Sequence, residues 1–211
     1  AGLKGTVLGK QQVGPKLTEN ADAYNAYLRA QYYLKRATKE DLEKALSYYQ
    51  QAITLDPGYA LAWVGLADAD CWRANQGYVP MTEGYERALQ VTERALALEP
   101  NLAQAHTLRG EIKWAYQLDW HGADAEMQRA LSLEAGNVEV LRQAARLAAA
   151  LGRLDETLEL DRRAVELDPL SVWSWVDLGF YSRYAGRLEQ AEAACKRGLE
   201  LSEDLPQAHW T

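Results

Sequence analysis

One six-residue pattern recurs through the chain and limits what it can fold into. It consists of a small residue, an apolar residue, any residue, Leu, an acid and Pro, as in Ala52–Pro57, Ala95–Pro100 and Ala164–Pro169. Weaker copies end at Ala135 and Glu203, so the ends of successive copies lie 43, 35, 34 and 34 residues apart. A repeat of that length is typical of small units that stack on one another.

Each copy of the pattern is predicted to end a helix, because proline cannot continue the helical hydrogen-bond ladder. Ala45, Tyr49 and Ala52 precede one such end at helical spacing, and Trp63, Leu66 and Ala67 open the next unit in the same way. Each unit therefore reads as two antiparallel helices. Because one pair cannot bury both of its apolar faces, the pairs must stack. We expect an all-α, right-handed α-solenoid of about five helix pairs, with the first helix of each pair on the concave face.

The array is expected to span residues 20–203, in units of about 20–57, 58–100, 101–135, 136–169 and 170–203. Residues 1–19 are rich in glycine and are interpreted as a linker or the tail of a preceding domain. Residues 204–211 are interpreted as the start of a further, truncated repeat. Gly77 and Pro80 mark a loop inserted at about 75–80, and Leu118–Gly122 is predicted as a turn.

Composition excludes several classes of function. The net charge of -7 gives no basic field to attract nucleic acid or anionic membranes. The longest apolar run, residues 147–151, is too short to span a bilayer. Cys71 and Cys195 fall in different units, which favours two reduced thiols over a disulfide. A cytoplasmic location fits unpaired cysteines, although a periplasmic one is also consistent with the sequence.

The spacing resembles that of the tetratricopeptide repeat (TPR) family. Trp63-x2-Leu66-Ala67 and Trp175-x2-Leu178-Gly179 match the first-helix pattern, and the alanine–large residue–alanine–proline spacing matches the second helix. The insertion before Met81, the missing proline at Ala135 and the acidic Asp161 depart from it. More weakly, residues 23–30 and 118–123 resemble TPR regions that follow the output domains of bacterial adenylate cyclases, kinases and winged-helix regulators.

In such an architecture the exposed groove is lined by first-helix residues that do not face the core. By register, the candidate partner-binding residues are Tyr24, Tyr27, Gln31, Asp68, Trp72, Gln104, Glu111, Trp114, Glu139, Arg142, Arg146, Trp173, Phe180, Arg183 and Tyr184. Aromatic and arginine side chains are the ones that binding hot spots favour. Alternatively, Trp72, Trp114, Trp173 and Phe180 pack between neighbouring helices.

Arg142 and Arg146 lie one helical turn apart and, with Arg183, are candidates to bind a carboxylate or phosphate. The alternative is that they pair with Glu139 or with neighbouring acids. Some TPR domains bind chaperone tails through a basic carboxylate clamp. Here the matching positions hold Tyr27, Gln31, Val64 and Asp68, which argues against that ligand.

No catalytic, metal or cofactor site is predicted. The three histidines, His106, His121 and His209, are scattered over separate elements, and neither a Cys/His cluster nor a glycine-rich phosphate loop is present. The leading hypothesis is a non-enzymatic module that binds a peptide or protein surface in its groove. The alternatives are a regulatory arm of a larger bacterial signalling protein, and a self-association scaffold whose homodimer forms through the C-terminal edge around Trp210.

Overall fold

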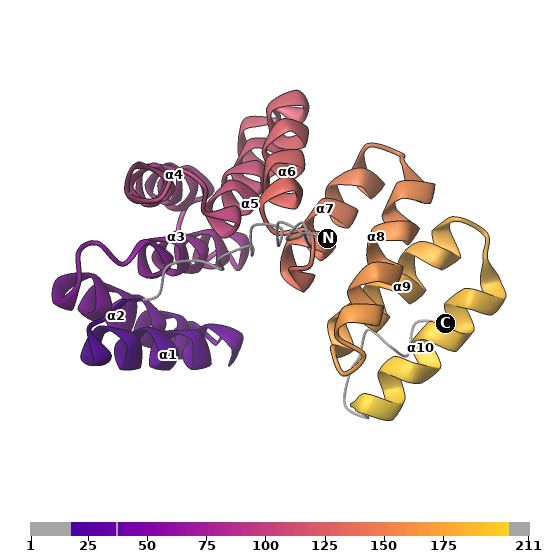
Figure 1. Cartoon of the computed structure of the whole chain (residues 1–211), viewed down its shortest axis with the longest axis horizontal. Coiled ribbons are helices and arrows are strands. Elements are labelled where there is room, and N and C mark those ends of the chain that lie inside the picture. Colours follow the sequence, from indigo (N-terminus) through magenta and orange to yellow (C-terminus); the bar gives the residue numbers. More distant parts are fainter. Residues whose placement is uncertain (1–17, 37, 203–211) are drawn as a thin grey trace, which may run out of the picture.

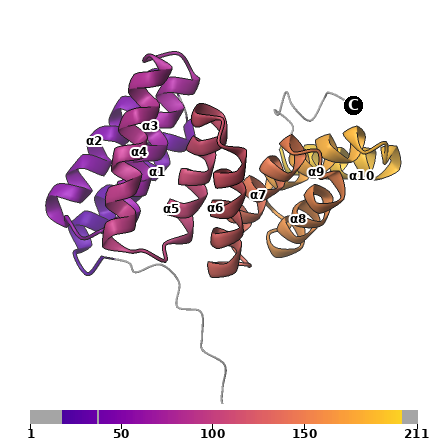
Figure 2. The same cartoon turned by 90° about the horizontal axis from the view of Figure 1, so that it is seen from above.

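The computed structural model describes residues 18–36 and 38–202 of the chain. This part contains ten α-helices and one π-helical segment, and no strand. Successive helices pair in an arc, as predicted for a right-handed α-solenoid (Figure 1, Figure 2). The elements are α1 (Ala21–Arg36), α2 (Lys39–Leu55), α3 (Ala60–Asn75), α4 (Met81–Leu98), α5 (Ala103–Ile112), η1 (Lys113–Gln117), α6 (Trp120–Leu133), α7 (Val138–Ala150), α8 (Leu154–Leu167), α9 (Val172–Tyr184) and α10 (Leu188–Leu201).

The helix ends follow local sequence signals. The Thr38 hydroxyl accepts a hydrogen bond from the Asp41 backbone N–H at 3.2 Å and caps α2. The side-chain oxygen of Asn20 accepts from the backbone N–H groups of Asp22 and Ala23, so Asn20 caps α1. The predicted loop at 75–80 is confirmed between α3 and α4, where Gly77 adopts a left-handed backbone conformation.

The predicted turn at residues 118–122 is only partly right. Trp120, His121 and Gly122 already belong to the first turn of α6, so the turn proper is Leu118 and Asp119. Leu118 has a φ of 56°, and the preceding residues 113–117 form a π-helical turn. Asp119 explains the early start of α6, because its carboxylate accepts from the Gly122 backbone N–H at 2.9 Å.

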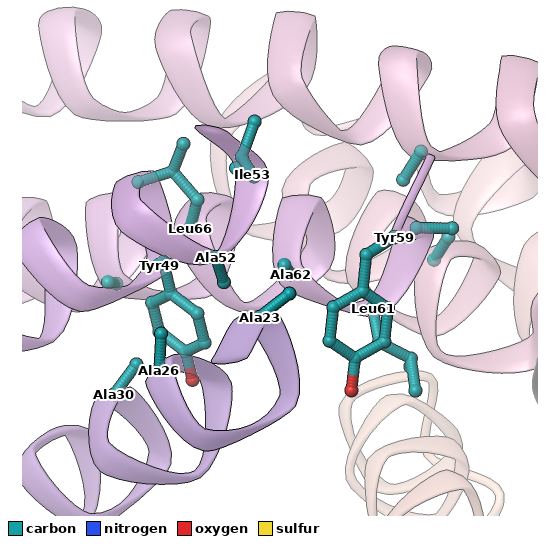
Figure 3. Packing of buried hydrophobic residues seen from close by; sticks show 14 of the residues in the cluster. Ala23, Ala26, Ala30, Tyr49, Ala52, Ile53, Tyr59, Leu61, Ala62 and Leu66 are labelled. Atoms are coloured by element: carbon teal, nitrogen blue, oxygen red, sulfur yellow. The ribbon is translucent and has the colours of Figure 1, made fainter. Parts of the chain in front are cut away.

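Small residues allow the helices to approach closely. Ala23, Ala26 and Ala30 are buried along α1, and Ala26 and Ala30 lie beside the fully buried ring of Tyr49 from α2 (Figure 3). A Cβ atom added to Gly65 of α3 would lie 2.2 Å from that ring, so only glycine fits there. The core is therefore built between neighbouring pairs, which fixes the orientation of the first helices that carry the candidate site.

The cysteines Cys71 and Cys195 are both buried and unbonded to one another. Residues 1–17 of the predicted linker, and residues 204–211 with Trp210, lie outside the described part of the chain. The interpretations of those segments remain predictions.

Candidate functional site

A repeated hydrogen bond sets the register of the first helices. Trp63 Nε1 donates to the Pro57 carbonyl oxygen at 3.0 Å, and Trp175 Nε1 donates to that of Pro169 at 2.9 Å. In the third pair, His106 Nε2 lies 3.0 Å from the Pro100 carbonyl oxygen. Each ring therefore ties its helix to the turn that precedes it, six residues earlier.

Equivalent residues of different helix pairs are found by counting from the last residue of each repeated pattern, which is Pro57, Pro100 or Ala135. The fourth residue along is Leu61, Gln104 or Glu139, and the eleventh is Asp68 or Glu111. These side chains, together with others from α1 and α2, line one cavity of about 180 Å³ on the first-helix side of the array. The lining residues are Tyr27, Gln31, Tyr49, Leu61, Val64, Gly65, Asp68, Gln104, Thr107, Leu108, Glu111, Glu139, Val140 and Gln143.

Six of the fifteen predicted residues meet at this cavity: Tyr27, Gln31, Asp68, Gln104, Glu111 and Glu139. The prediction missed Val64 and Thr107, which the proline register would have found, since each stands seven residues after its proline. It also missed Tyr49, which comes from a second helix. Tyr49 reaches the cavity only because Gly65 leaves room for its ring, and no first-helix pattern indicates that.

The cavity lining has acidic side chains and no basic one. Asp68 and Glu111 make no ion pair with any residue in the described ranges, and Glu139 pairs with Arg142 at 3.0 Å from outside the lining. Two polar atoms at the cavity are buried without a hydrogen-bond partner, the Tyr49 hydroxyl and Gln104 Oε1. Buried polar atoms of this kind normally find a partner, so the cavity has unused hydrogen-bonding capacity.

Burial changes the ionisation of these acids. Burial, and then the nearby carboxylates of Glu111 and Glu139, raise the pKa of Asp68 from its ordinary value to about 8. Burial also raises the pKa of Glu111, against the opposing effect of Arg146. A positive charge placed among these carboxylates would lower both pKa values.

The structure does not bring the three arginines of the predicted anion site together. Arg142 donates to Asp177 at 2.7 Å and to Glu139 at 3.0 Å, so the alternative of pairing with neighbouring acids holds for this residue. Arg146 donates to the Gln143 side chain at 3.1 Å. Arg183 is exposed at the end of α9 and has an interaction of its own. The three arginines therefore do not form one open cluster.

The predicted aromatic residues divide into two groups. Trp114 is partly buried and packs on the Trp120 ring at a centroid distance of 6.0 Å. Exposed aromatic side chains remain on three of the first helices, with Phe180 and Tyr184 in contact at 4.8 Å. The exposed predicted residues are Tyr24, Trp72, Trp173, Phe180 and Tyr184, and the largest group of them lies on α9. Tyr32 of α1 is also exposed and was not predicted.

Comparison with known proteins now identifies the repeat. A model of the tetratricopeptide repeat matches residues 21–59, which cover α1, α2 and the following turn. The solved structure of TTC0263, a thermophilic TPR protein of Thermus thermophilus, superposes with a TM-score of 0.65 at 25% identity over 77% of this chain and 82% of that one. The chain belongs to the TPR family. TPR arrays are protein–protein interaction modules and are generally non-catalytic scaffolds, and this chain has their architecture.

Other matches to known proteins differ in extent. YrrB, described as a TPR protein with an unusual peptide-binding site, superposes with a TM-score of 0.53 at 23% identity, covering 89% of this chain and 90% of that one. An uncharacterised protein of Methanocaldococcus jannaschii is 36% identical over 78 residues, or 35% of this chain and 80% of that protein. The mouse protein O-mannosyl-transferase TMTC1 is 35% identical over 79 residues, 37% of this chain. Since the match spans 8% of that enzyme, its activity is not transferred to this TPR array.

Neither a membrane span nor a metal site is found among the described residues. No helix within residues 18–36 and 38–202 has the length and apolar character required to cross a bilayer. In the same ranges, no three His, Cys, Asp or Glu side chains are grouped closely enough to hold a metal ion.

Proposed function

We propose that this TPR array captures a peptide segment of a partner protein along its first-helix face, without catalysing a reaction. The observation that carries the proposal is the convergence of first-helix side chains on one cavity. Trp173 and Phe180 on α9 have exposed rings and stand four and eleven residues after Pro169. These are the positions that line the cavity in earlier helix pairs. A groove that offers both pockets and aromatic anchors suits an extended or helical peptide.

The aromatic side chains supply the contact area in this proposal. Phe180 is 52% exposed and Tyr184 is 68% exposed, so both have apolar surface to bury against a ligand. Aromatic rings bury large areas with few rotatable bonds, which lowers the entropy lost on binding. The description of YrrB as a peptide-binding TPR protein supports the same use of this fold.

The test is a selection of random displayed peptides on the full chain, followed by calorimetric measurement of the recovered peptides. We expect Phe180→Ala, and separately Gln31→Ala, to weaken binding by about tenfold or more, as hot-spot truncation does. Leu188→Ala is the matched control, because Leu188 is an exposed apolar residue of α10, 67% accessible and outside the groove. Peptides that bind both groove variants as tightly as the unaltered chain would overturn the proposal.

The regulatory-arm hypothesis is compatible with peptide capture and differs only in what the array is attached to. No comparison bears on that attachment, so the hypothesis stays a prediction. Self-association through Trp210 also stays a prediction, because Trp210 lies outside the described residues.

A further inference from the structure

We propose that the cavity lined by α1, α2, α3, α5 and α7 receives the cationic end of one lysine or arginine side chain of the bound peptide. This inference rests on the proposed function and adds the chemistry of the partner. It also reverses the ligand charge expected from the sequence, where three arginines suggested an anionic group.

The size of the cavity favours a single side chain. Its volume of about 180 Å³ lies below the roughly 300–1,000 Å³ of typical small-molecule and cofactor sites. Leu61, Val64 and Leu108 supply apolar wall. Long basic side chains lay their methylene stems against such surface while the charged end seeks polar partners.

The polar groups of the cavity suit a donor of several N–H bonds. Asp68 and Glu111 offer carboxylate oxygens with no ion-pair partner in the described chain. Tyr49 is fully buried, and its hydroxyl oxygen at the cavity has no hydrogen-bond partner. Gln104 Oε1 is a further unpartnered acceptor, contributed by α5. An ammonium group has three N–H donors and a guanidinium group has five, with no acceptor to leave unsatisfied.

A metal ion is a poorer match for these groups. The carboxylates of Asp68, Glu111 and Glu139 come from three different helices, and the described residues contain no set of three acids close enough to coordinate one ion. A guanidinium group spreads its N–H donors over three nitrogen atoms and can reach separated acceptors, whereas an ammonium group needs only two or three of the oxygen atoms present.

The proposal is tested by a coupling experiment on a peptide recovered in the selection. The first readout is composition: recovered peptides should carry lysine or arginine at one fixed position. Replacing that residue by norleucine keeps most of the stem and removes the charge. We expect this change to weaken binding to the unaltered chain by about tenfold or more, since it leaves the cavity carboxylates without a partner.

The second half of the experiment changes the protein. In a chain carrying Asp68→Asn and Glu111→Gln, the lysine and norleucine peptides should bind with equal affinity. Glu159→Gln with Glu166→Gln is the control of equal charge change, because both acids are exposed on α8, away from the cavity. In this control the discrimination between the two peptides should persist. Circular dichroism spectra of the variants establish that each is folded.

The outcomes separate the inference from the proposed function. Peptides that depend on Phe180 and Gln31 but carry no fixed cation, or that lose the same affinity with norleucine in every variant, would overturn the inference alone. Peptides that do not depend on the groove would overturn both. Free N-acetyl-lysine amide, tested as a competitor, should displace the lysine peptide only weakly, because it lacks the rest of the segment.

Discussion

At the scale of single residues, Asp161 occupies in α8 the place that Tyr49 occupies in α2 and Met127 in α6. It is fully buried, and neither of its carboxylate oxygens has a hydrogen-bond partner in the described residues. Burial, and then the nearby carboxylate of Asp177, raise the pKa of Asp161 to about 8, while Arg142 opposes the shift. A residue in the usual core position of the repeat therefore carries a titratable charge.

This burial makes stability depend on pH. Because the pKa of Asp161 is higher in the folded chain than its ordinary value of 3.8, the folded state holds the proton more tightly between about pH 4 and pH 8. The stability that comes from protonated Asp161 is complete below about pH 4 and is lost progressively as the pH rises from there through 8. We expect Asp161→Asn to raise the free energy of unfolding more at pH 9 than at pH 5, with a difference on the order of 2 kcal/mol.

Urea unfolding at the two pH values measures this difference. Asp22→Asn is the control, because Asp22 is exposed on α1 and should show no comparable dependence on pH. An equal effect of Asp161→Asn at pH 5 and pH 9 would contradict the assigned burial of charge.

Gly65 provides a second test at the residue scale. A Cβ atom there would lie 2.2 Å from Cε1 and 2.8 Å from the hydroxyl oxygen of Tyr49, so the buried ring would have to move. Although alanine favours a helix, we expect Gly65→Ala to destabilise the chain by about 1–3 kcal/mol through overpacking. Gly136→Ala is the control, because no heavy atom lies within 4 Å of a Cβ placed at that position. Thermal unfolding that gives both variants the same midpoint would refute the close approach.

Arg142 illustrates why charge reversal is a poor test of the groove. The residue is partly buried between Glu139 and Asp177, with Asp161 nearby. Arg142→Glu would add a carboxylate to three others, so lost binding in that variant would report damaged packing as readily as a lost contact.

At the scale of elements, the junction between η1 and α6 departs most from the regular hairpin. Leu118 is exposed and left-handed, and the π-helical turn before it sets the position of Asp119. The Asp119 side chain caps α6 and also pairs with Lys113 at 2.8 Å. Hydrogen bonds from Lys113 and from the Gly122 backbone lower the pKa of Asp119.

Two substitutions separate the roles of Asp119. Asp119→Ala removes both the cap and the ion pair, and we expect it to lower the denaturation midpoint of the chain. Asp119→Asn keeps a capping oxygen and removes only the charge, so it should retain most of that stability, as exposed ion pairs contribute little. Chemical denaturation of both variants is the measurement. A larger loss in Asp119→Asn than in Asp119→Ala would show that the cap is not what starts α6.

At the scale of the whole molecule, each helix pair packs mainly on its neighbours along the arc (Figure 1). The cavity is lined by α1, α2, α3, α5 and α7, and no lining residue comes from α9 or α10. The exposed aromatic group of α9 and the acidic cavity are therefore carried by separable parts of one array.

Removing residues 170–211 should leave the other eight of the ten described helices folded. We expect a lower unfolding midpoint, because the face of α8 that packs on α9 becomes exposed, and an m-value smaller by roughly a fifth. Circular dichroism during urea unfolding measures both quantities. Loss of helical signal from the whole chain at zero denaturant would contradict the nearest-neighbour description.

The amino-acid sequence by itself determined the solenoid, because helix ends, small residues at crossings and the proline-ended repeat are local or periodic features. The same register predicted six side chains that meet at the cavity, including Asp68 and Glu111. Only the tertiary structure decided the charge of the site. Arg142 is neutralised by Asp177, which lies 35 residues away in the next unit, and Tyr49 enters from a second helix beside Gly65. Such contacts depend on how successive pairs are rotated against one another, and a pattern within one helix carries no information about that rotation.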